Sequence, residues 1–467
     1  MFRSALLILS GNAFGSAMTF LRNLLVARLV SVEDYGIAAT FAISMAIVEL
    51  TSSFGLQQLI VQDKDGNDTK LQSGLQGFHA VRAVFSAALL FFLAHPIANF
   101  LGIPEVAWAY QVLAIVPLLN GFIHFDVYRL QRQQKFGPLI LSTSLPAFLS
   151  VVLTWPLFQY FGDYRVMLYA VIAQGVATVA LSHVVAIRSY SLRLDKQLVR
   201  RAFYFGWPLL VNNVLLLFVL EGEKIIVGRE MSMANLAIFA MGFTMTLTPT
   251  LIVAKSTQSF FLPQLSAAKD EQERFRQLAY SVMQVSLLNG LILTAGITIL
   301  GAIFVQFALG EKYAPLIPYL IPLAVLHALR VFKTGSATVA LAVGRTSNAM
   351  IANLFRVISL PFSWYAAVLG NDLLVVILIA STGELLGFTV SLLLVRTRVN
   401  LPLRPMLLPI FLGFVLLGSV MARQFWFEDL NLLWITVIAF LLIMSEALSM
   451  KDLRDYIRKG VFTRFAE

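Results

Sequence analysis

The sequence contains no cysteine, and only 13% of its 467 residues are charged. Without cysteine the chain forms neither a disulfide framework nor a thiolate metal site or nucleophile. The scarcity of charge and the 58% share of hydrophobic residues exclude a soluble domain, which could not bury that much apolar surface. Apolar runs of about twenty residues exclude the alternating pattern of a transmembrane β-barrel. The composition therefore predicts an all-α polytopic membrane protein.

Fourteen apolar runs are long enough to cross a bilayer as helices. A basic loop at residues 188–201 separates the first six predicted helices from the next six, and a last pair of helices follows. Because six is even, the two sets would share one orientation. We expect an N-terminal six-helix lobe at 1–195, a C-terminal six-helix lobe at 196–398, and an extra helix pair with a basic cytoplasmic tail at 399–467. The predicted helices are 4–27, 35–60, 75–100, 106–128, 138–161, 166–187, 203–227, 236–262, 278–309, 316–343, 349–369, 373–395, 406–422 and 431–450.

The 35 lysines and arginines are distributed unevenly around these helices. With the amino terminus inside, 23 of them lie in cytoplasmic segments and five in external loops. The positive-inside rule then places both termini and the loop at 188–201 in the cytoplasm. The tail at 451–467 alternates basic with apolar residues, which predicts a helix lying on anionic lipid.

The remaining seven basic residues lie inside predicted helices, where a lone charge costs several kcal/mol unless it meets water, a partner or a ligand. Arg22 lies about two turns before a turn predicted at residues 33–36, on a polar helix face with Thr19 and Asn23. We expect five of the seven to contact an anionic substrate. The alternative is that each pairs with an acid for packing, as Arg22 would with Glu49. The five are Arg22, Lys255, Arg330, Lys333 and Arg356.

Other polar or small residues in the helices have simpler explanations. We expect Arg82 to reach toward the cytoplasm, and Lys224 to pair with Glu221 three residues before it. Gly11 and Gly15 are typical of helix-packing positions in membranes. These residues are predicted to be structural.

Buried carboxylates are the usual proton or sodium sites of transporters. Glu223 and Asn212 lie eleven residues apart on one stripe of the seventh helix, and Glu384 is on the twelfth. We expect these three residues to form a coupling-ion site. The alternative is that the carboxylates form salt bridges to the intramembrane cations. Asp126 precedes Arg129 by three residues, which predicts an ion pair at the membrane surface.

Several motifs, taken in order, resemble one family. They are LRNLLVARLVSVEDYG at 21–36, LQRQQKF at 130–136, SLRLD at 191–195 with FGWPLL at 205–210, EKIIVGREMS at 223–232 and ALGEKY at 308–313. Over about residues 1–400 the chain is similar to the polysaccharide transporters, the lipid-linked oligosaccharide flippases of the multidrug/oligosaccharidyl-lipid/polysaccharide exporter superfamily. This resemblance implies two six-helix lobes around a central cationic cavity. It also implies a cavity arginine on the first helix, which falls on Arg22.

The chemistry of flipping agrees with this resemblance. Each saccharide hydroxyl costs on the order of 1–3 kcal/mol unpaired in an apolar medium, and a diphosphate attracts arginine and lysine. We therefore expect a bacterial inner-membrane flippase, not an enzyme, that moves a polyprenyl-diphosphate-linked oligosaccharide to the outer leaflet by alternating access. The saccharide would be a repeat unit of an exopolysaccharide, capsule or O-antigen. We expect no cofactor, a coupling ion that is Na⁺ or H⁺, and as partners membrane lipids and other polysaccharide-assembly membrane proteins, but no nucleic acid.

Two other functions stay open on the sequence. A multidrug or metabolite exporter of the same superfamily would favour an acidic and aromatic site for cations, whereas basic residues here are at least as numerous as acids within the helices. A membrane scaffold of a polysaccharide assembly complex would need no transport of its own. A charge variant that assembles but loses transport would argue against the scaffold.

Overall fold

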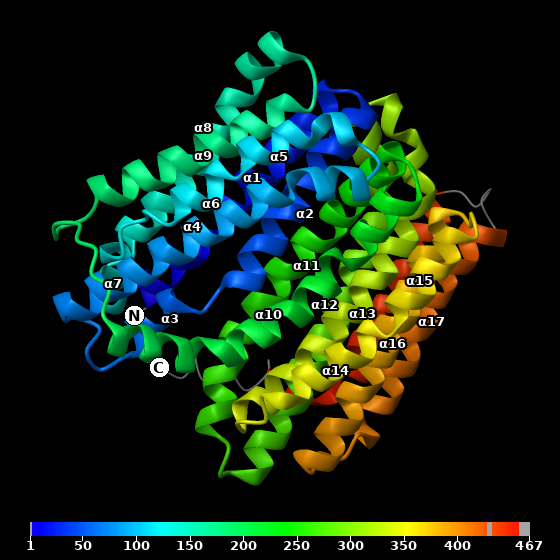
Figure 1. Ribbon diagram of the computed structural model, residues 1–467. Coiled ribbons are helices and arrows are strands. Elements are labelled where there is room, and N and C mark those ends of the chain that lie inside the picture. Colours follow the sequence, from blue (N-terminus) through cyan, green and yellow to red (C-terminus); the bar gives the residue numbers. More distant parts are fainter. Residues whose placement is uncertain (1, 427–431, 457–467) are drawn as a thin grey trace. The chain divides into compact units, whose positions relative to one another are not determined.

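The computed structural model describes residues 2–426 and 432–456, and every regular element in those ranges is a helix (Figure 1). Packing divides the chain into two compact units, Met1–Ala240 and Met241–Glu467. The lobe boundaries expected after residues 195 and 398 stay predictions, because they rest on symmetry and not on packing.

In the first unit, α1 (Phe2–Leu29) packs on α8 (Gly137–Phe161), and α8 packs on α9 (Arg165–Val184). The other long helices are α2 (Val32–Ser52), α4 (Thr69–Phe100) and α10 (Lys196–Glu230), and α10 packs against both α2 and α4. Short elements connect them: α3 (Leu56–Gln62), the 3-10 turn η1 (Pro104–Val106), α5 (Ala107–Leu113), α6 (Ile115–Asn120) and α7 (Asp126–Arg132).

The central helix of the second unit is α13 (Ile317–Ala342), which is buried around most of its circumference. It packs on α12 (Gln272–Ala308) and on α16 (Leu373–Arg398), and α12 and α16 run along it in Figure 1. The remaining elements are α11 (Met233–Ala267), which begins in the first unit, η2 (Glu311–Leu316), α14 (Ser347–Val357), α15 (Ser359–Val368), α17 (Arg404–Trp426) and α18 (Leu432–Ser449).

Ten helices in the described part of the chain are long and apolar enough to cross a membrane. A further candidate is α10, which bends by 44° between Trp207 and Leu209. The other three predicted spans coincide with α1, with the short helices from η1 to α7, and with α18. The all-α polytopic fold is confirmed, and each of the fourteen predicted spans coincides with helical structure.

Several helix boundaries differ from the prediction, and two of them have a clear local cause. The turn expected at residues 33–36 comes earlier, because Ser31 caps α2 and its Oγ accepts the N–H of Asp34 at 3.0 Å. Glu33 and Asp34 then form the first turn of α2, where the helix dipole favours negative charge. The span predicted at 35–60 divides into α2 and α3 at Gly55, whose φ of 62° lies in the left-handed region that glycine adopts without strain.

Small residues bring α1 and α8 close together. The Ser144 hydroxyl on α8 donates a hydrogen bond to the carbonyl oxygen of Gly11 at 3.0 Å. A Cβ atom added to Gly15 would lie 3.4 Å from the same hydroxyl oxygen. The prediction that Gly11 and Gly15 are helix-packing positions is confirmed.

A second set of polar contacts fastens the segment at 185–195 to α4 and α7. Asp126 pairs with Arg129 at 2.5 Å, and its other carboxyl oxygen accepts the N–H of Ile187 at 2.8 Å. On α4, Gln76 donates to the carbonyl oxygen of Ser191 at 2.8 Å. The predicted pair of Asp126 with Arg129 is confirmed, and it is buried because the chain after α9 covers it. Its position at the membrane surface stays a prediction.

The segment after α18 is helical at residues 451–456 and docks on α11 and α12. Gln284 of α12 accepts the N–H of Leu453 at 2.9 Å, and Gln264 of α11 accepts the hydroxyl of Tyr456 at 2.8 Å. Burial raises the pKa of Asp452 above its usual value, although Gln284 donates a hydrogen bond to it. The rest of the surface helix predicted at 451–467 lies outside the described residues.

Candidate functional site

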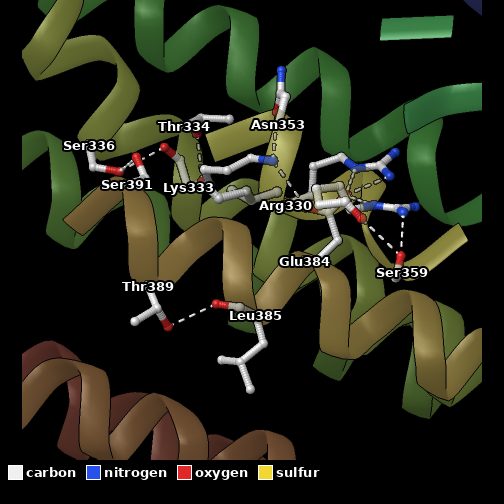
Figure 2. Close-up of polar contacts among 12 residues, drawn as sticks. Arg330, Lys333, Thr334, Ser336, Asn353, Ser359, Glu384, Leu385, Thr389 and Ser391 are labelled. Carbon is white, nitrogen blue, oxygen red and sulfur yellow. Dashed lines mark hydrogen bonds and ion pairs between the residues drawn. The ribbon is translucent and has the colours of Figure 1, made fainter. Parts of the chain in front are cut away.

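Three basic side chains of the second unit surround one carboxylate, Glu384 in the middle of α16 (Figure 2). Its Oε1 atom lies 2.7 Å from Nη2 of Arg330 and 3.1 Å from Nε of Arg356. Its Oε2 atom lies 3.1 Å from Nζ of Lys333. All four side chains are buried, so these contacts are little screened by water. We call these four residues the α13–α16 charge cluster.

Neutral groups add further contacts to the cluster. The Lys333 ammonium also donates to Oδ1 of Asn353 at 3.0 Å (Figure 2). Arg356 donates through Nη1 to Oγ of Ser359 at 3.0 Å. The guanidinium of Arg330 lies over the ring of Phe243, 5.6 Å from its centroid. Such contacts orient cationic groups and lower the cost of burying them.

The local sequence explains how three helices meet at this carboxylate. Arg330 and Lys333 are three residues apart on α13, so they share one face of that helix. On α16, Gly383 and Gly387 flank Glu384 by one and three residues. A Cβ atom on Gly383 would lie 2.9 Å from the carbonyl oxygen of Arg356, and one on Gly387 would lie 3.0 Å from that of Ala352. Only glycine leaves room there for α14 to approach α16.

The sequence predicted Arg330, Lys333 and Arg356 as cationic site residues, and the structure brings these three together. It also brings Glu384 to them, which matches the alternative in which a carboxylate neutralises intramembrane bases. A role for Glu384 in binding a coupling ion stays a prediction.

Arg22 forms a different kind of site in the first unit. Its side chain is only 7% exposed, and its Nη1 atom donates to the amide oxygen of Gln174 on α9 at 2.5 Å. A longer contact of 3.4 Å joins its Nη2 atom to the side chain of the neighbouring Asn23. In the described ranges no carboxylate pairs with Arg22, and Glu49, the acid considered as its partner, is exposed. Arg22 is therefore a buried cation held by neutral amides.

The other predicted site residues are less defined. Lys255 is exposed on α11, and it forms neither a hydrogen bond nor an ion pair with any described residue. Glu223 is buried on α10 and is 1% exposed, and Asn212 on the same helix is half-buried. Their part in an ion site stays a prediction.

Two predictions about structural residues can be compared with the contacts. Lys224 pairs with Glu221 at 2.9 Å, as predicted. Arg82 is half-buried and donates to the carbonyl oxygen of Ser52 at 2.9 Å and to His79 at 3.3 Å. These neutral groups lie at the end of α2 and on α4 itself.

Sequence reasoning missed the neutral partners, Gln174 for Arg22 and Asn353 for Lys333. Gln174 is the single amide side chain of α9, and Asn353 lies on α14 three residues before Arg356. An amide shielded from water needs a hydrogen-bond partner. That signal was available, but it does not say which cation the amide meets. For metals, the described residues contain no group of three or more His, Cys, Asp and Glu side chains that could hold an ion.

The two sites differ in whether their basic groups are already paired with an oxyanion. A guanidinium presents several N–H donors in a plane, which match the paired oxygens of a phosphate or carboxylate. In the charge cluster, the carboxylate of Glu384 already occupies such donors. At Arg22, the partners are neutral, so the positive charge is not neutralised by an ion pair among the described residues.

Comparison with known proteins finds relatives in sequence and in fold. In sequence, the chain is 22% identical over 393 residues to the teichuronic acid biosynthesis protein TuaB of Bacillus subtilis, covering 80% of each. It is 19% identical to the lipopolysaccharide biosynthesis protein WzxC of Escherichia coli, over 71% of this chain and 68% of that one.

The fold is similar to that of the lipid II flippase MurJ in an inward closed conformation. The TM-score is 0.73 at 15% identity, over 97% of this chain and 100% of that one. A family model described as polysaccharide biosynthesis protein matches residues 25–318, well over half of the sequence. The chain therefore belongs to the polysaccharide biosynthesis protein family.

Proposed function

We propose that this protein is a flippase that moves a polyprenyl-diphosphate-linked oligosaccharide from the inner to the outer leaflet of a bacterial cytoplasmic membrane by alternating access. The observation that carries this proposal is Arg22, a buried cation on α1 whose hydrogen-bond partners are neutral. Burying a charge in that position costs several kcal/mol of free energy, so we expect a ligand that stabilises the charge. A diphosphate is such a ligand.

The cationic groups also bear on the competing exporter function. A multidrug or metabolite exporter that takes cations would need acidic or aromatic groups at its site, whereas Arg22, Arg330, Lys333 and Arg356 favour an anion. We infer that the five predicted bases, Lys255 included, contact the diphosphate in the course of transport. The polyprenyl chain can stay in lipid throughout, so it needs no polar site.

Energy, orientation and partners complete the proposal. Export against a gradient needs a coupled Na⁺ or H⁺, for which Glu223, Glu384 and Asn212 are the proposed residues. The excess of basic residues in one set of loops supports cytoplasmic termini. The substrate of the protein is then a lipid-linked saccharide. Its proposed partners are other membrane proteins of polysaccharide assembly.

Substitution of Arg22 tests the proposal. We expect Arg22→Ala to reach the membrane at the wild-type level but to lose saccharide export, because the charge that contacts the diphosphate is gone. Arg22→Lys should keep part of the activity, since it keeps the charge and loses the bidentate geometry. Arg82→Ala is the matched control, an arginine of the same unit that is also held by neutral groups. It should export normally.

Binding by purified protein separates a transporter from a scaffold. Undecaprenyl diphosphate should raise the melting temperature of the wild type and of Arg82→Ala but not that of Arg22→Ala, and uncharged undecaprenol should have no such effect. A well-folded Arg22→Ala protein that still exports saccharide would contradict the diphosphate assignment. Undiminished export by every single-base variant would favour the scaffold.

A further inference from the structure

A buried carboxyl group in the C-terminal helix pair has no partner in the part of the chain that the structure describes. Glu446 on α18 is 1% exposed, and neither of its carboxyl oxygens forms a hydrogen bond or ion pair with any described residue. Its backbone is tied normally into the helix, since Ser449 donates to its carbonyl oxygen at 2.7 Å. The unpartnered group is therefore the acid function alone.

The surroundings of this carboxyl group are apolar. The helices packed against α18 are α12 and α17. A Cβ atom built on Gly413 of α17 would lie 3.8 Å from Oε1 of Glu446 and 3.7 Å from Cδ1 of Leu291 of α12. The carboxyl group thus points to the place where α12 and α17 meet, lined by a glycine and a leucine.

Charged groups on these helices are engaged elsewhere or lie at helix ends. On α12, Arg274 pairs with Glu271 at 3.3 Å, Arg276 pairs with Glu273 at 3.5 Å, and Tyr280 donates to the Pro402 carbonyl at 2.7 Å. None of these groups, nor Arg404 and Arg423 at the two ends of α17, contacts Glu446 in the described part of the chain. No cation among the described residues stabilises an ionised form of Glu446.

An ionised carboxylate without partners in an apolar setting costs far more than the neutral acid, so the group takes up a proton instead. We propose that Glu446 is a proton-binding site, which holds its proton while α18 packs on α12 and α17 and releases it when that contact opens to water. The site lies outside residues 25–318, which match the family model, so it goes beyond the proposed flipping function.

Infrared spectroscopy tests the protonation directly. Purified wild-type protein at pH 7 should show the carbonyl stretching band of a protonated carboxylic acid, and Glu446→Gln should lack that band. Melting temperatures give a second readout. Because the packed state binds the extra proton, wild-type stability should fall from pH 6 to pH 9, while Glu446→Gln should change less. Identical infrared spectra and pH profiles for the two proteins would overturn the proposal.

A matched pair at Gly413 tests the geometry without removing the acid. Gly413→Ser places a hydroxyl donor beside Oε1 of Glu446, and Gly413→Ala adds the same carbon without the donor. One hydrogen bond to the ionised form should raise the proton concentration at half-protonation about tenfold in Gly413→Ser. Gly413→Ala should leave it unchanged. If the proton concentration at half-protonation is the same in Gly413→Ser and Gly413→Ala, Glu446 does not titrate beside Gly413.

Discussion

At the scale of single residues, the α13–α16 charge cluster and Arg22 differ in how their charge is balanced. In the cluster, one carboxylate accepts hydrogen bonds from Arg330, Lys333 and Arg356. Arg22 instead has amide partners. Removing the acid from a buried ion pair leaves uncompensated charge and is strongly destabilising, whereas removing a cation held by amides relieves an insertion cost. Substituting Glu384 should therefore destabilise the protein, whereas substituting Arg22 should not.

Glu384→Gln should destabilise the protein by roughly 3–5 kcal/mol, because three basic groups lose the carboxylate that they share. The expected result is a lower melting temperature and less protein in the membrane. Adding Lys333→Met should restore part of the stability, since one of the unbalanced charges is removed. Glu223→Gln, which removes a buried carboxyl charge outside the charge cluster, is the variant with which the melting temperature of Glu384→Gln is compared. If Glu384→Gln melts like the wild type but turns over slowly under a defined ion gradient, Glu384 is a coupling residue and its contacts are not needed for stability.

At the scale of secondary-structure elements, the segment at 185–195 is fastened to two helices by a buried acid and a buried amide. Asp126 accepts N–H groups of Ile187 and Arg188 at 2.8 and 3.3 Å, and Gln76 donates to Ser191. Because these bonds end on the backbone, they hold the path of the segment and do not depend on its side chains. The connection from the sixth predicted helix to α10 is therefore a fixed part of the first unit.

Asp126→Asn should loosen this connection. The variant keeps the shape of the side chain but loses the negative charge that pairs with Arg129 and accepts two backbone N–H groups. The expected loss is about 3–5 kcal/mol, seen as faster proteolysis between residues 185 and 195 and a lower melting temperature. Asp163→Asn is the matched control. Its partner Arg165 is 39% exposed, so that pair should contribute at most about 1 kcal/mol. Equal proteolysis of both variants would mean that Asp126 does not fasten the segment.

At the scale of the whole molecule, orientation in the membrane follows from the distribution of basic residues. The chain has no native cysteine, so single cysteines report their own accessibility. A membrane-impermeant maleimide added to intact cells should label Arg165→Cys and should label Lys196→Cys only after the membrane is opened. Labelling of Lys196→Cys from outside would reverse the topology. Because both positions border helices of the first unit, the pair also tests whether α9 spans the membrane.

The sequence by itself determined the membrane class, the positions of the spans and the residue types of the candidate site. These follow from local properties. A run of about twenty apolar residues crosses the bilayer as a helix, and an intramembrane charge needs water, a partner or a ligand to stabilise it. Helix boundaries were less predictable where one side chain or one left-handed glycine decides them, as Ser31 and Gly55 do.

Only the tertiary structure decided which polar groups meet. The sequence contained Glu384 and three bases on α13 and α14, but two of the glycines on α16 are what allow those helices to approach within reach. It contained Arg22 and several acids, yet packing on α9 gives Arg22 an amide and leaves Glu49 exposed. Glu446 was visible as an acid in the last helix, and only the packing of α12 and α17 around it leaves it without a partner. Such pairings depend on side-chain reach between segments distant in sequence, which no local pattern encodes.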